Sequence, residues 1–303
     1  MKLLETISPF IVYISSERRL SQHTVKAYST DLDQFVAYAA SEWNIDDLDE
    51  LSYQVISEWQ MHLTEINENA NSVKRKLTTL RTWCRFMRKQ GWLQEDVMTK
   101  IVSPKTPKYL PVFFTEKEVD KIYDDIYFPD DFEGRRDRLL LQLLYETGIR
   151  RAEVLTLTED AVDLAALTIK VHGKRDKDRI IPIENELAHT IKCYFSLKKM
   201  IAGCSDAFFV KSDGTPFKEH NVTKVVKKYM TLFSNAERIS PHIFRHTFAT
   251  HLLNEGADIN AIKELLGHTD LAATEVYTHV SREHLKETYR HTHPRSNKDK
   301  NNH

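Results

Sequence analysis

Tyrosine, arginine and histidine side chains that could together cut a phosphodiester lie in one stretch of the sequence. The stretch reads His242-Ile243-Phe244-Arg245-His246-Thr247, then Leu266-Gly267-His268, then Tyr277-Thr278-His279. A tyrosine oxygen can act as a covalent nucleophile, and a guanidinium can hold two phosphate oxygens. Imidazole can move protons near neutral pH. A helical core with solvated histidines remains an alternative, because an HxxR pattern alone does not exclude it.

Two short helices would position these side chains. A helix over residues 242–254 places His242 and Arg245 at i and i+3 on one face, and Gly256 is a plausible stop. A second helix, about Ile259 to Leu266, ends at Gly267 and brings His268 to the turn. Tyr277 follows nine positions later (277 − 268).

Composition indicates a globular chain that is large enough for two domains. The sequence has 303 residues, of which 41% are hydrophobic and 29% charged. No apolar run is long enough for a membrane span, and the start lacks a signal-peptide pattern. The cysteines are odd in number and not spaced as CxxC (Cys84, Cys193 and Cys204). We therefore expect a cytoplasmic protein with reduced thiols.

The first 102 residues read as a helical domain. Ser21 is a plausible N-cap, and apolar stripes at helical spacing run over residues 25–39, 55–66 and 73–87. The segment 103–111 contains three prolines, which suit an extended linker. We place a second domain at 112–294 and a polar, disordered tail at 295–303.

The third helix of the first domain carries a basic face. The net charge of −1 gives no global hint of nucleic acid. However, the window from Asn69 to Gln94 holds no acidic residue and contains the cations Lys74, Arg75, Lys76, Arg81, Arg85, Arg88 and Lys89. Lys74, Arg81, Arg85 and Arg88 line up about 90° from the apolar stripe, at roughly 100° per residue. The helix could lie along a DNA duplex, or the face could simply be solvated.

The second domain begins with helices. Thr115 to Glu118 forms a capping box, and an apolar helix over Arg135–Tyr145 is stopped by Gly148. Arg150 and Arg151 start the next helix. Such a pair is usually a surface feature held by neighbouring acids, and a phosphate clamp is the other interpretation.

Strand signals follow. Leu167, Ile169 and Val171 alternate with other residues, and Arg179-Ile180-Ile181-Pro182 continues after a turn, so we predict a β-hairpin. Its tip carries Lys174, Arg175 and Lys177. Such a basic tip suits either a solvent-exposed turn or a contact in a groove of a nucleic acid. We also predict a short strand over Asp206–Val210, a helix over 219–235 and a last helix around His284 to Tyr289.

We expect no metal and no cofactor. The sequence has neither a Walker A motif nor GxGxxG. His242, His246 and His251 do not have HExxH spacing, and Arg245 between them would repel a cation.

With these residues assembled, the chain resembles the tyrosine recombinase (phage integrase) family, and most closely its XerC/XerD type. Five motifs carry the resemblance in family order: Thr147-Gly148-Ile149-Arg150 with Glu153, the lysine hairpin Gly173 to Arg179, the HxxR motif from His242, Leu265-Leu266-Gly267-His268, and Tyr277-Thr278-His279-Val280. Two departures are visible. Ala152 stands where the family often has Ser, and Arg175 stands where a second Gly is usual, which bears on the flexibility of the hairpin.

The resemblance implies a mainly α fold, with a helical DNA-binding domain and an α+β catalytic domain that holds a small antiparallel sheet. It implies that Tyr277 attacks a DNA phosphate to give a 3′-phosphotyrosine and that Arg150 and Arg245 hold the phosphate. It also implies that Lys174 protonates the leaving oxygen, while His242 and His268 assist. Lys74, Arg75, Arg81, Arg85, Arg88, Arg175 and Lys177 would contact DNA.

The same resemblance implies four subunits on two recombination sites, as a homo- or heterotetramer with a second related recombinase, and a DNA translocase as a further partner. Chromosome dimer resolution at cell division is the role that it implies. Alternatives are an integrase or invertase of a mobile element or phase-variable region, a type IB topoisomerase, and a non-catalytic DNA-binding protein of this fold.

Overall fold

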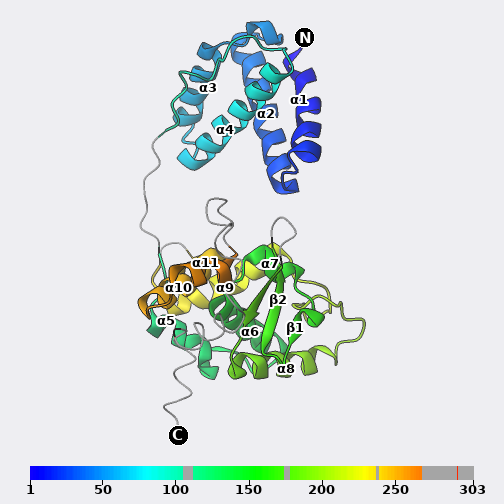
Figure 1. Cartoon of the computed structure of the whole chain (residues 1–303), viewed down its shortest axis with the longest axis vertical. Helices are drawn as coiled ribbons and strands as arrows, with labels where there is room; N and C mark the ends of the chain where they lie inside the picture. Colours follow the sequence, from blue (N-terminus) through cyan, green and yellow to red (C-terminus); the bar gives the residue numbers. More distant parts are fainter. Residues whose placement is uncertain (105–111, 174–177, 237–238, 268–291, 293–303) are drawn as a thin grey trace. The chain divides into compact units, whose positions relative to one another are not determined.

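The computed structural model describes residues 1–104, 112–173, 178–236, 239–267 and 292 (Figure 1). The chain divides into two compact units, Met1–Tyr109 and Leu110–His303. The division lies inside the segment 103–111 for which the sequence predicts a linker. The domain bounds 1–102 and 112–294, and the disordered tail at 295–303, stay predictions.

The first unit is a bundle of four helices, which confirms the helical expectation: α1 (Leu3–Val12), α2 (Gln22–Trp43), α3 (Tyr53–Glu65) and α4 (Ala70–Lys89). Ser21 caps α2 as predicted, because its hydroxyl accepts a hydrogen bond from the Thr24 N–H at 3.3 Å. Three large rings from three helices fill the centre. Phe35 lies edge-on to Trp59 and Trp83, with centroids 5.1 and 6.1 Å away.

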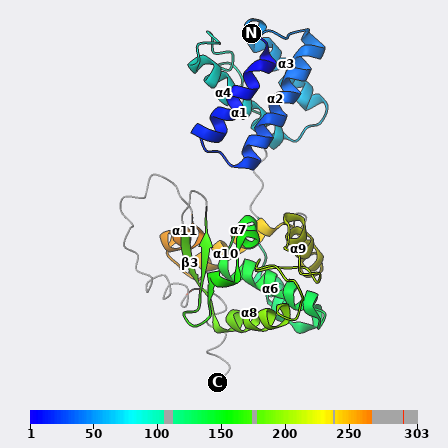
Figure 2. The ribbon, with the colours of Figure 1, turned by 90° about the vertical axis from the view of Figure 1, so that its right-hand side faces the viewer.

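The second unit is built around α6 (Phe132–Thr147), which runs through the middle and packs on α8 (Asn185–Lys198) and α10 (Pro241–Asn254) (Figure 2). Helix α6 is buried almost all round from Leu139 to Thr147, as a central helix must be. In the described part of this unit the other α-helices are α5 (Glu116–Asp120), α7 (Arg151–Thr156), α9 (Glu219–Phe233) and α11 (Ile259–Leu266).

The predicted β-hairpin is present at the edge of a small antiparallel sheet. Strands β1 (Val162–Asp163), β2 (Thr168–His172) and β3 (Asp178–Pro182) lie in the order β1-β2-β3. The last pair before the tip is His172 with Asp178. The tip residues Lys174, Arg175 and Lys177 lie outside the described residues, as does the predicted helix around His284 to Tyr289.

The predicted strand Asp206–Val210 is wrong. The segment makes only isolated bridges, between Thr158 and Ala207 and between Val210 and Pro216. Phe208 and Phe209 are both buried although they are adjacent, whereas a strand with one core face would bury alternate residues. The Val210 N–H donates to the Tyr194 hydroxyl at 3.2 Å, so that backbone donor is satisfied without a partner strand.

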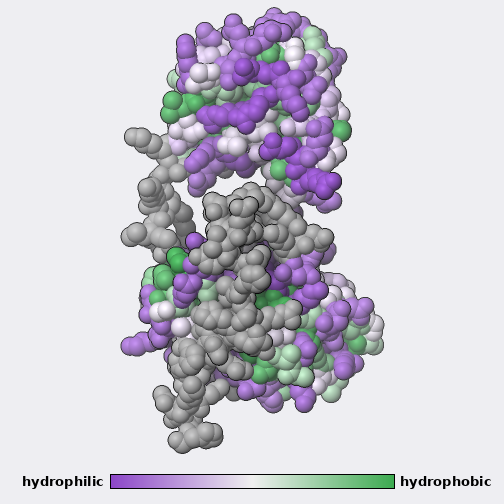
Figure 3. Space-filling view, viewed as in Figure 1, coloured by the Kyte–Doolittle hydropathy of each residue, from purple (hydrophilic) through white to green (hydrophobic). Residues whose placement is uncertain are grey.

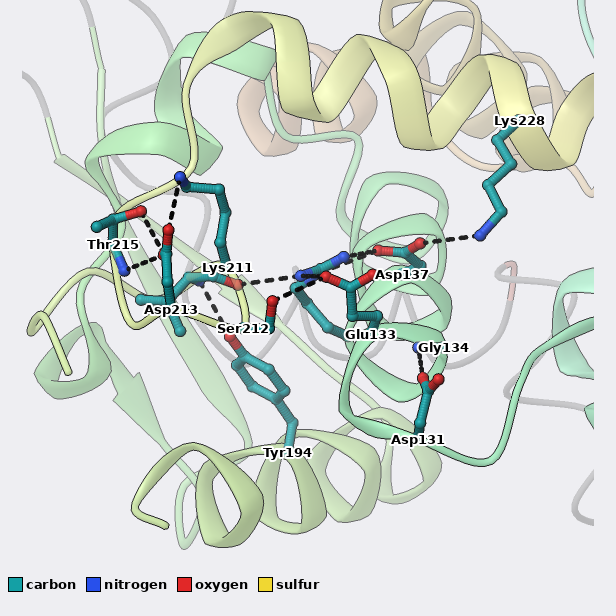
Figure 4. A network of polar contacts seen from close by, with 12 residues as sticks. Asp131, Glu133, Gly134, Asp137, Tyr194, Lys211, Ser212, Asp213, Thr215 and Lys228 are labelled. Atoms are coloured by element: carbon teal, nitrogen blue, oxygen red, sulfur yellow. Dashed lines mark hydrogen bonds and ion pairs between the residues drawn. The ribbon is translucent and has the colours of Figure 1, made fainter. Parts of the chain in front are cut away.

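This loop is fixed to α6 by the buried Arg136, whose Nη1 donates to the Val210 carbonyl at 3.4 Å, within the polar network of Figure 4. The Arg136 Nε and Nη2 atoms donate to Asp137 Oδ1 at 3.0 and 2.7 Å, and the guanidinium lies 4.6 Å from the centre of the Phe217 ring. Lys228 of α9 approaches the other carboxylate oxygen at 3.6 Å. Burial raises the pKa of Asp137, against the opposing effect of Arg136. The network therefore joins α6, α9 and the loop.

Where the first unit can be seen in Figure 3, its outer surface is largely hydrophilic. Among the helices that the structure describes, none is long and apolar enough to cross a membrane.

The turn after α6 should tolerate no side chain. Gly148 has φ +57°, and a Cβ there would lie 2.7 Å from Phe248 and 2.8 Å from Leu266. Gly256 has φ +87° with open space around it. We expect Gly256→Ala to lower the free energy of unfolding by about 1–2 kcal/mol through backbone strain alone. Gly148→Ala should lower the free energy of unfolding by roughly 1–3 kcal/mol more than Gly256→Ala does, because its Cβ also overpacks the site.

Urea unfolding of the full chain measures this difference. All four tryptophans lie in the first unit, at positions 43, 59, 83 and 92. Tryptophan fluorescence therefore reports that unit alone, and far-UV circular dichroism reports both. The circular dichroism transition should shift while the fluorescence transition stays in place. Equal losses in the two variants would contradict the packing argument.

Candidate active site

Three arginines converge on the C-terminal end of α11. Arg179 donates through Nε to the Leu265 carbonyl at 2.9 Å, Arg245 donates through Nη2 to the Leu266 carbonyl, and Arg150 donates through Nη2 to the Gly267 carbonyl at 3.2 Å. The last carbonyls of a helix have no partner within the helix and carry partial negative charge. The end of α11 thus collects three guanidiniums that come from a helix start, a strand and another helix.

Glu153 of α7 holds two of these arginines. Its carboxylate accepts hydrogen bonds from Arg179 Nη1 and Nη2 at 2.9 and 2.8 Å, which is a bidentate contact. It also accepts from the backbone N–H and Nη1 of Arg150, both at 2.8 Å. The Arg150 backbone contact exists because Arg150 is the N-cap of α7 and Glu153 is the third helical residue, as in a capping box.

Burial opposes ionisation of Glu153, but the hydrogen bonds from Arg179 and Arg150 outweigh it and lower the Glu153 pKa from 4.5 to about 2. The carboxylate is therefore ionised at neutral pH. Among the described residues, Glu153 is the one carboxylate that hydrogen-bonds to any of these three arginines, and it binds only Arg150 and Arg179. The cluster therefore keeps an excess of positive charge. An anion such as a phosphate would complete it.

Arg245 of α10 is held by backbone carbonyls alone among the residues that the structure describes. Its Nη1 donates to the Gly148 carbonyl at 2.8 Å, besides the contact to Leu266. Burial and the charges of Arg150 and Arg179 lower its pKa to about 9, so it stays charged at neutral pH. A guanidinium has five N–H donors, which leaves Arg245 with donors for a ligand.

His242 lies one helical turn before Arg245 on α10, as the sequence predicts. Its side chain is exposed. Partial burial of the ring, followed by the charges of Arg151, Arg245 and Arg150, lowers the His242 pKa below 6.5. At neutral pH the imidazole is therefore uncharged and able to accept a proton.

The other catalytic candidates, Lys174, His268 and Tyr277, lie outside the described residues, as do Arg175 and Lys177. The structure describes the positions next to two of them. Gly267 ends α11 immediately before His268 with φ +63°, and Gly173 follows β2 immediately before Lys174.

Of the three histidines considered as metal ligands, His251 has both ring nitrogens occupied by protein groups. His251 is buried, with Nδ1 at 3.0 Å from the Tyr145 hydroxyl and Nε2 at 2.9 Å from the Phe114 carbonyl. Since a carbonyl only accepts, Nε2 carries the proton and Nδ1 accepts from Tyr145. His251 therefore bridges α6, α10 and the segment before α5.

The basic face of α4 divides into two groups. Lys74 and Arg85 are exposed, and their side chains have no hydrogen-bond partner in the described part of the chain. The other three candidates bind protein groups. Arg75 pairs with the buried Asp31, Arg88 pairs with Asp96 at 2.8 Å, and Arg81 donates to the Ile101 carbonyl at 2.7 Å and the Ser103 hydroxyl at 3.2 Å.

Sequence reasoning quoted Glu153 and Arg179 within motifs but gave neither a role. For Glu153 a signal was available, because an acid three residues after a helix start is the capping-box spacing. For Arg179 the sequence offers none, since the contacts that use its guanidinium come from residues 26 and 86 positions away.

Comparisons with known proteins identify the family of the chain. Residues 112–284 match the phage integrase family, and residues 7–91 match the phage integrase N-terminal SAM-like domain. The chain is 36% identical to "Tyrosine recombinase XerC" of Oceanobacillus iheyensis over 97% of both chains, and 35% identical to the protein of that name from Staphylococcus saprophyticus, over 96% of this chain and 97% of the other.

Among solved structures, the fold is similar to the XerH site-specific recombinase bound to difH substrate, with a TM-score of 0.72 and 22% identity, over 94% of each chain. The chain belongs to the phage integrase family of tyrosine recombinases. It is an enzyme that breaks and rejoins DNA, and the mainly helical fold with a small antiparallel sheet is the one predicted.

The Glu153 carboxylate should make stability depend on pH in acid. Its pKa is depressed in the folded state, so its contribution is present above pH 4.5 and is lost as pH falls towards about 2. That shift corresponds to roughly 3 kcal/mol. Glu153→Gln should therefore unfold more easily in urea at pH 7, and its difference from the unaltered chain should shrink between pH 4.5 and 2.

Asp213→Asn is the matched control. Asp213 also has a pKa of about 2, set by Thr215 and Lys211, but its side chain is 57% exposed. Water and salt screen such a site, so the effect should be small. A Glu153→Gln difference that stays constant with pH would show that packing, and not charge, explains it.

Proposed function

We propose that this chain performs site-specific recombination in the resolution of chromosome dimers at cell division. The observation that carries the chemistry is the cluster of three guanidiniums at the end of α11, which has one hydrogen-bonded carboxylate, Glu153, in the described part of the chain. The cluster therefore leaves positive charge for a scissile phosphate. Similarity over nearly the full length to proteins named Tyrosine recombinase XerC supports the role and weighs against a mobile-element integrase or invertase.

In the proposed reaction the Tyr277 oxygen attacks a DNA phosphorus. A bond forms between that oxygen and phosphorus, and the bond from phosphorus to the 5′-oxygen breaks. Arg150 and Arg245 hold the nonbridging oxygens as negative charge redistributes. The tyrosine proton passes to His242, and Lys174 supplies a proton to the leaving 5′-oxygen. His268 hydrogen-bonds the phosphate.

The product is a 3′-phosphotyrosine and a free 5′-hydroxyl. Because the covalent linkage conserves the energy of the broken bond, rejoining needs no ATP. The guanidiniums supply the positive charge that a metal supplies in other phosphoryl-transfer sites, and we propose that the reaction needs no cofactor.

The proposed assembly is four subunits on two double-stranded DNA sites in the cytoplasm, as a homotetramer or with a second related recombinase. A DNA translocase is a further partner that this role implies. In the proposed DNA interface, Lys74 and Arg85 contact phosphates of the duplex, while Arg75, Arg81 and Arg88 contribute after exchanging a protein partner for DNA. Arg175 and Lys177 of the hairpin tip would also contact DNA.

Tyr277→Phe tests the nucleophile. Removing one hydroxyl should leave DNA affinity unchanged and abolish the covalent protein–DNA adduct on a nicked suicide substrate, in which the cleaved strand cannot be rejoined. Denaturing gel electrophoresis detects the adduct. The matched control is Tyr229→Phe on α9, whose phenol is buried in the second unit and should not affect the adduct. An adduct that persists in Tyr277→Phe would mean that another residue attacks.

The salt dependence of DNA binding tests the face of α4. The plot of log affinity against log salt has a negative slope, and each lost phosphate contact makes it shallower by about 0.9. We expect the double variant Lys74→Glu, Arg85→Glu to make the slope shallower by about 1.8. Arg81 is unsuitable because its loss also releases Ile101 and Ser103. Lys2→Glu, which reverses an exposed cation paired with Asp47, controls for charge reversal at a position outside α4; it changes the net charge by half as much as the double variant. An unchanged slope in the double variant favours the solvated face.

A further inference from the structure

The Arg179 guanidinium is buried and hydrogen-bonded to other groups of the protein. Its side chain is 11% exposed. All three of its nitrogens donate: Nε to Leu265, and Nη1 and Nη2 to Glu153. A guanidinium in this state has little left for DNA, in contrast to Arg150, whose side chain is 26% exposed. Arg179 is therefore suited to holding other groups in place rather than to binding the phosphate itself.

The position of Arg179 determines what it holds. It lies on β3, the edge strand of the sheet, one residue after the Asp178 that pairs with His172 at the end of the described hairpin. An edge strand has no further strand to fix its position. Arg179 supplies that fixation by joining β3 to Glu153 of α7 and to the end of α11.

The fit around Arg179 is tight at α11. Gly267 has φ +63°, and a Cβ on it would lie 3.3 Å from Arg179 Cδ. The opposite face of the hairpin is held differently, by exposed contacts of Asp178 with Lys170 at 2.8 Å and with His172 at 2.7 Å. The exposed contacts are screened by water and contribute little. The buried contacts of Arg179 join β3 to α7, whose N-cap is Arg150, and to the end of α11.

We propose that Arg179 is a positioning residue for proton delivery: through Glu153 and Leu265 it holds β3, the strand that follows the hairpin tip, against the elements that carry Arg150 and Gly267. The inference rests on the proposed role of Lys174 as general acid. Without Arg179 the hairpin still pairs through β2 and β3, and Arg150 still keeps Glu153 and Gly267. In such a variant the phosphate would still be bound, and only the proton transfer from Lys174 to the leaving 5′-oxygen would be slower.

The test compares DNA with an ordinary 5′-oxygen at the scissile bond and DNA with a bridging 5′-sulfur. A thiolate leaves without a proton because thiols are far more acidic than alcohols. We expect Arg179→Met in the full chain to cleave ordinary DNA about 10- to 100-fold more slowly, since misplacement of a catalytic group by about 1 Å costs that much. Sulfur should restore most of that rate, with DNA affinity unchanged.

Three controls define the outcomes. Sulfur should rescue Lys174→Ala and should not rescue Arg150→Ala. Lys170→Gln, which removes an exposed contact of the same hairpin, should cleave at the normal rate. Arg179→Lys keeps one contact to Glu153, and we expect a smaller defect. If circular dichroism shows that Arg179→Met is unfolded, Arg179→Lys replaces it in the comparison of the two DNA substrates.

Cleavage at the normal rate in both Arg179 variants would overturn the inference, as would a slow variant that sulfur does not rescue while it rescues Lys174→Ala. A failure of sulfur to rescue Lys174→Ala is a different result. It would refute the proposed general acid, and the inference with it.

Discussion

The carboxylate of Glu153 is the interaction on which the described site depends. It lies in the first turn of α7, accepts from the backbone and side chain of Arg150, and binds Arg179 across two oxygens. Without a carboxylate there, two buried or half-buried guanidiniums would face each other with no counter-charge, which costs several kcal/mol. One acid therefore joins a helix start, an edge strand and the Arg150 guanidinium between them.

The sequence predicts the elements of this site well because local signals define them. Gly148 and Gly267 both end helices in the left-handed conformation, and the capping residues Ser21 and Thr115 define the starts of α2 and α5. The contacts that assemble the site are not local. Arg245 reaches the carbonyls of Gly148 and Leu266, which lie 97 and 21 positions away, and nothing in the spacing of residues predicts such a pairing.

The same distinction explains the basic face of α4. Helical periodicity predicts that Lys74, Arg81, Arg85 and Arg88 share a side, and α4 spans all of them. Periodicity does not reveal that residues after the helix return to it. Arg81 holds Ile101 and Ser103, and Gln60 of α3 holds the Val102 carbonyl at 3.0 Å. The segment leading out of the first unit is thus bound to the helices up to residue 103, and a cation that looks available in the sequence contributes to that attachment.

The choice of acceptors around the arginines has an electrostatic consequence. A carboxylate for each guanidinium would fix the side chains firmly but would also neutralise them, and a phosphate would then gain little on entering. Carbonyl oxygens at the end of α11 offer directed hydrogen bonds with only partial charge. Arg245, which is held by carbonyls alone in the described part of the chain, keeps its full charge and has its pKa lowered by its neighbours. An anion would relieve the repulsion between Arg245 and its neighbouring guanidiniums, so the proposed phosphate would gain affinity from charges that the fold already holds in place.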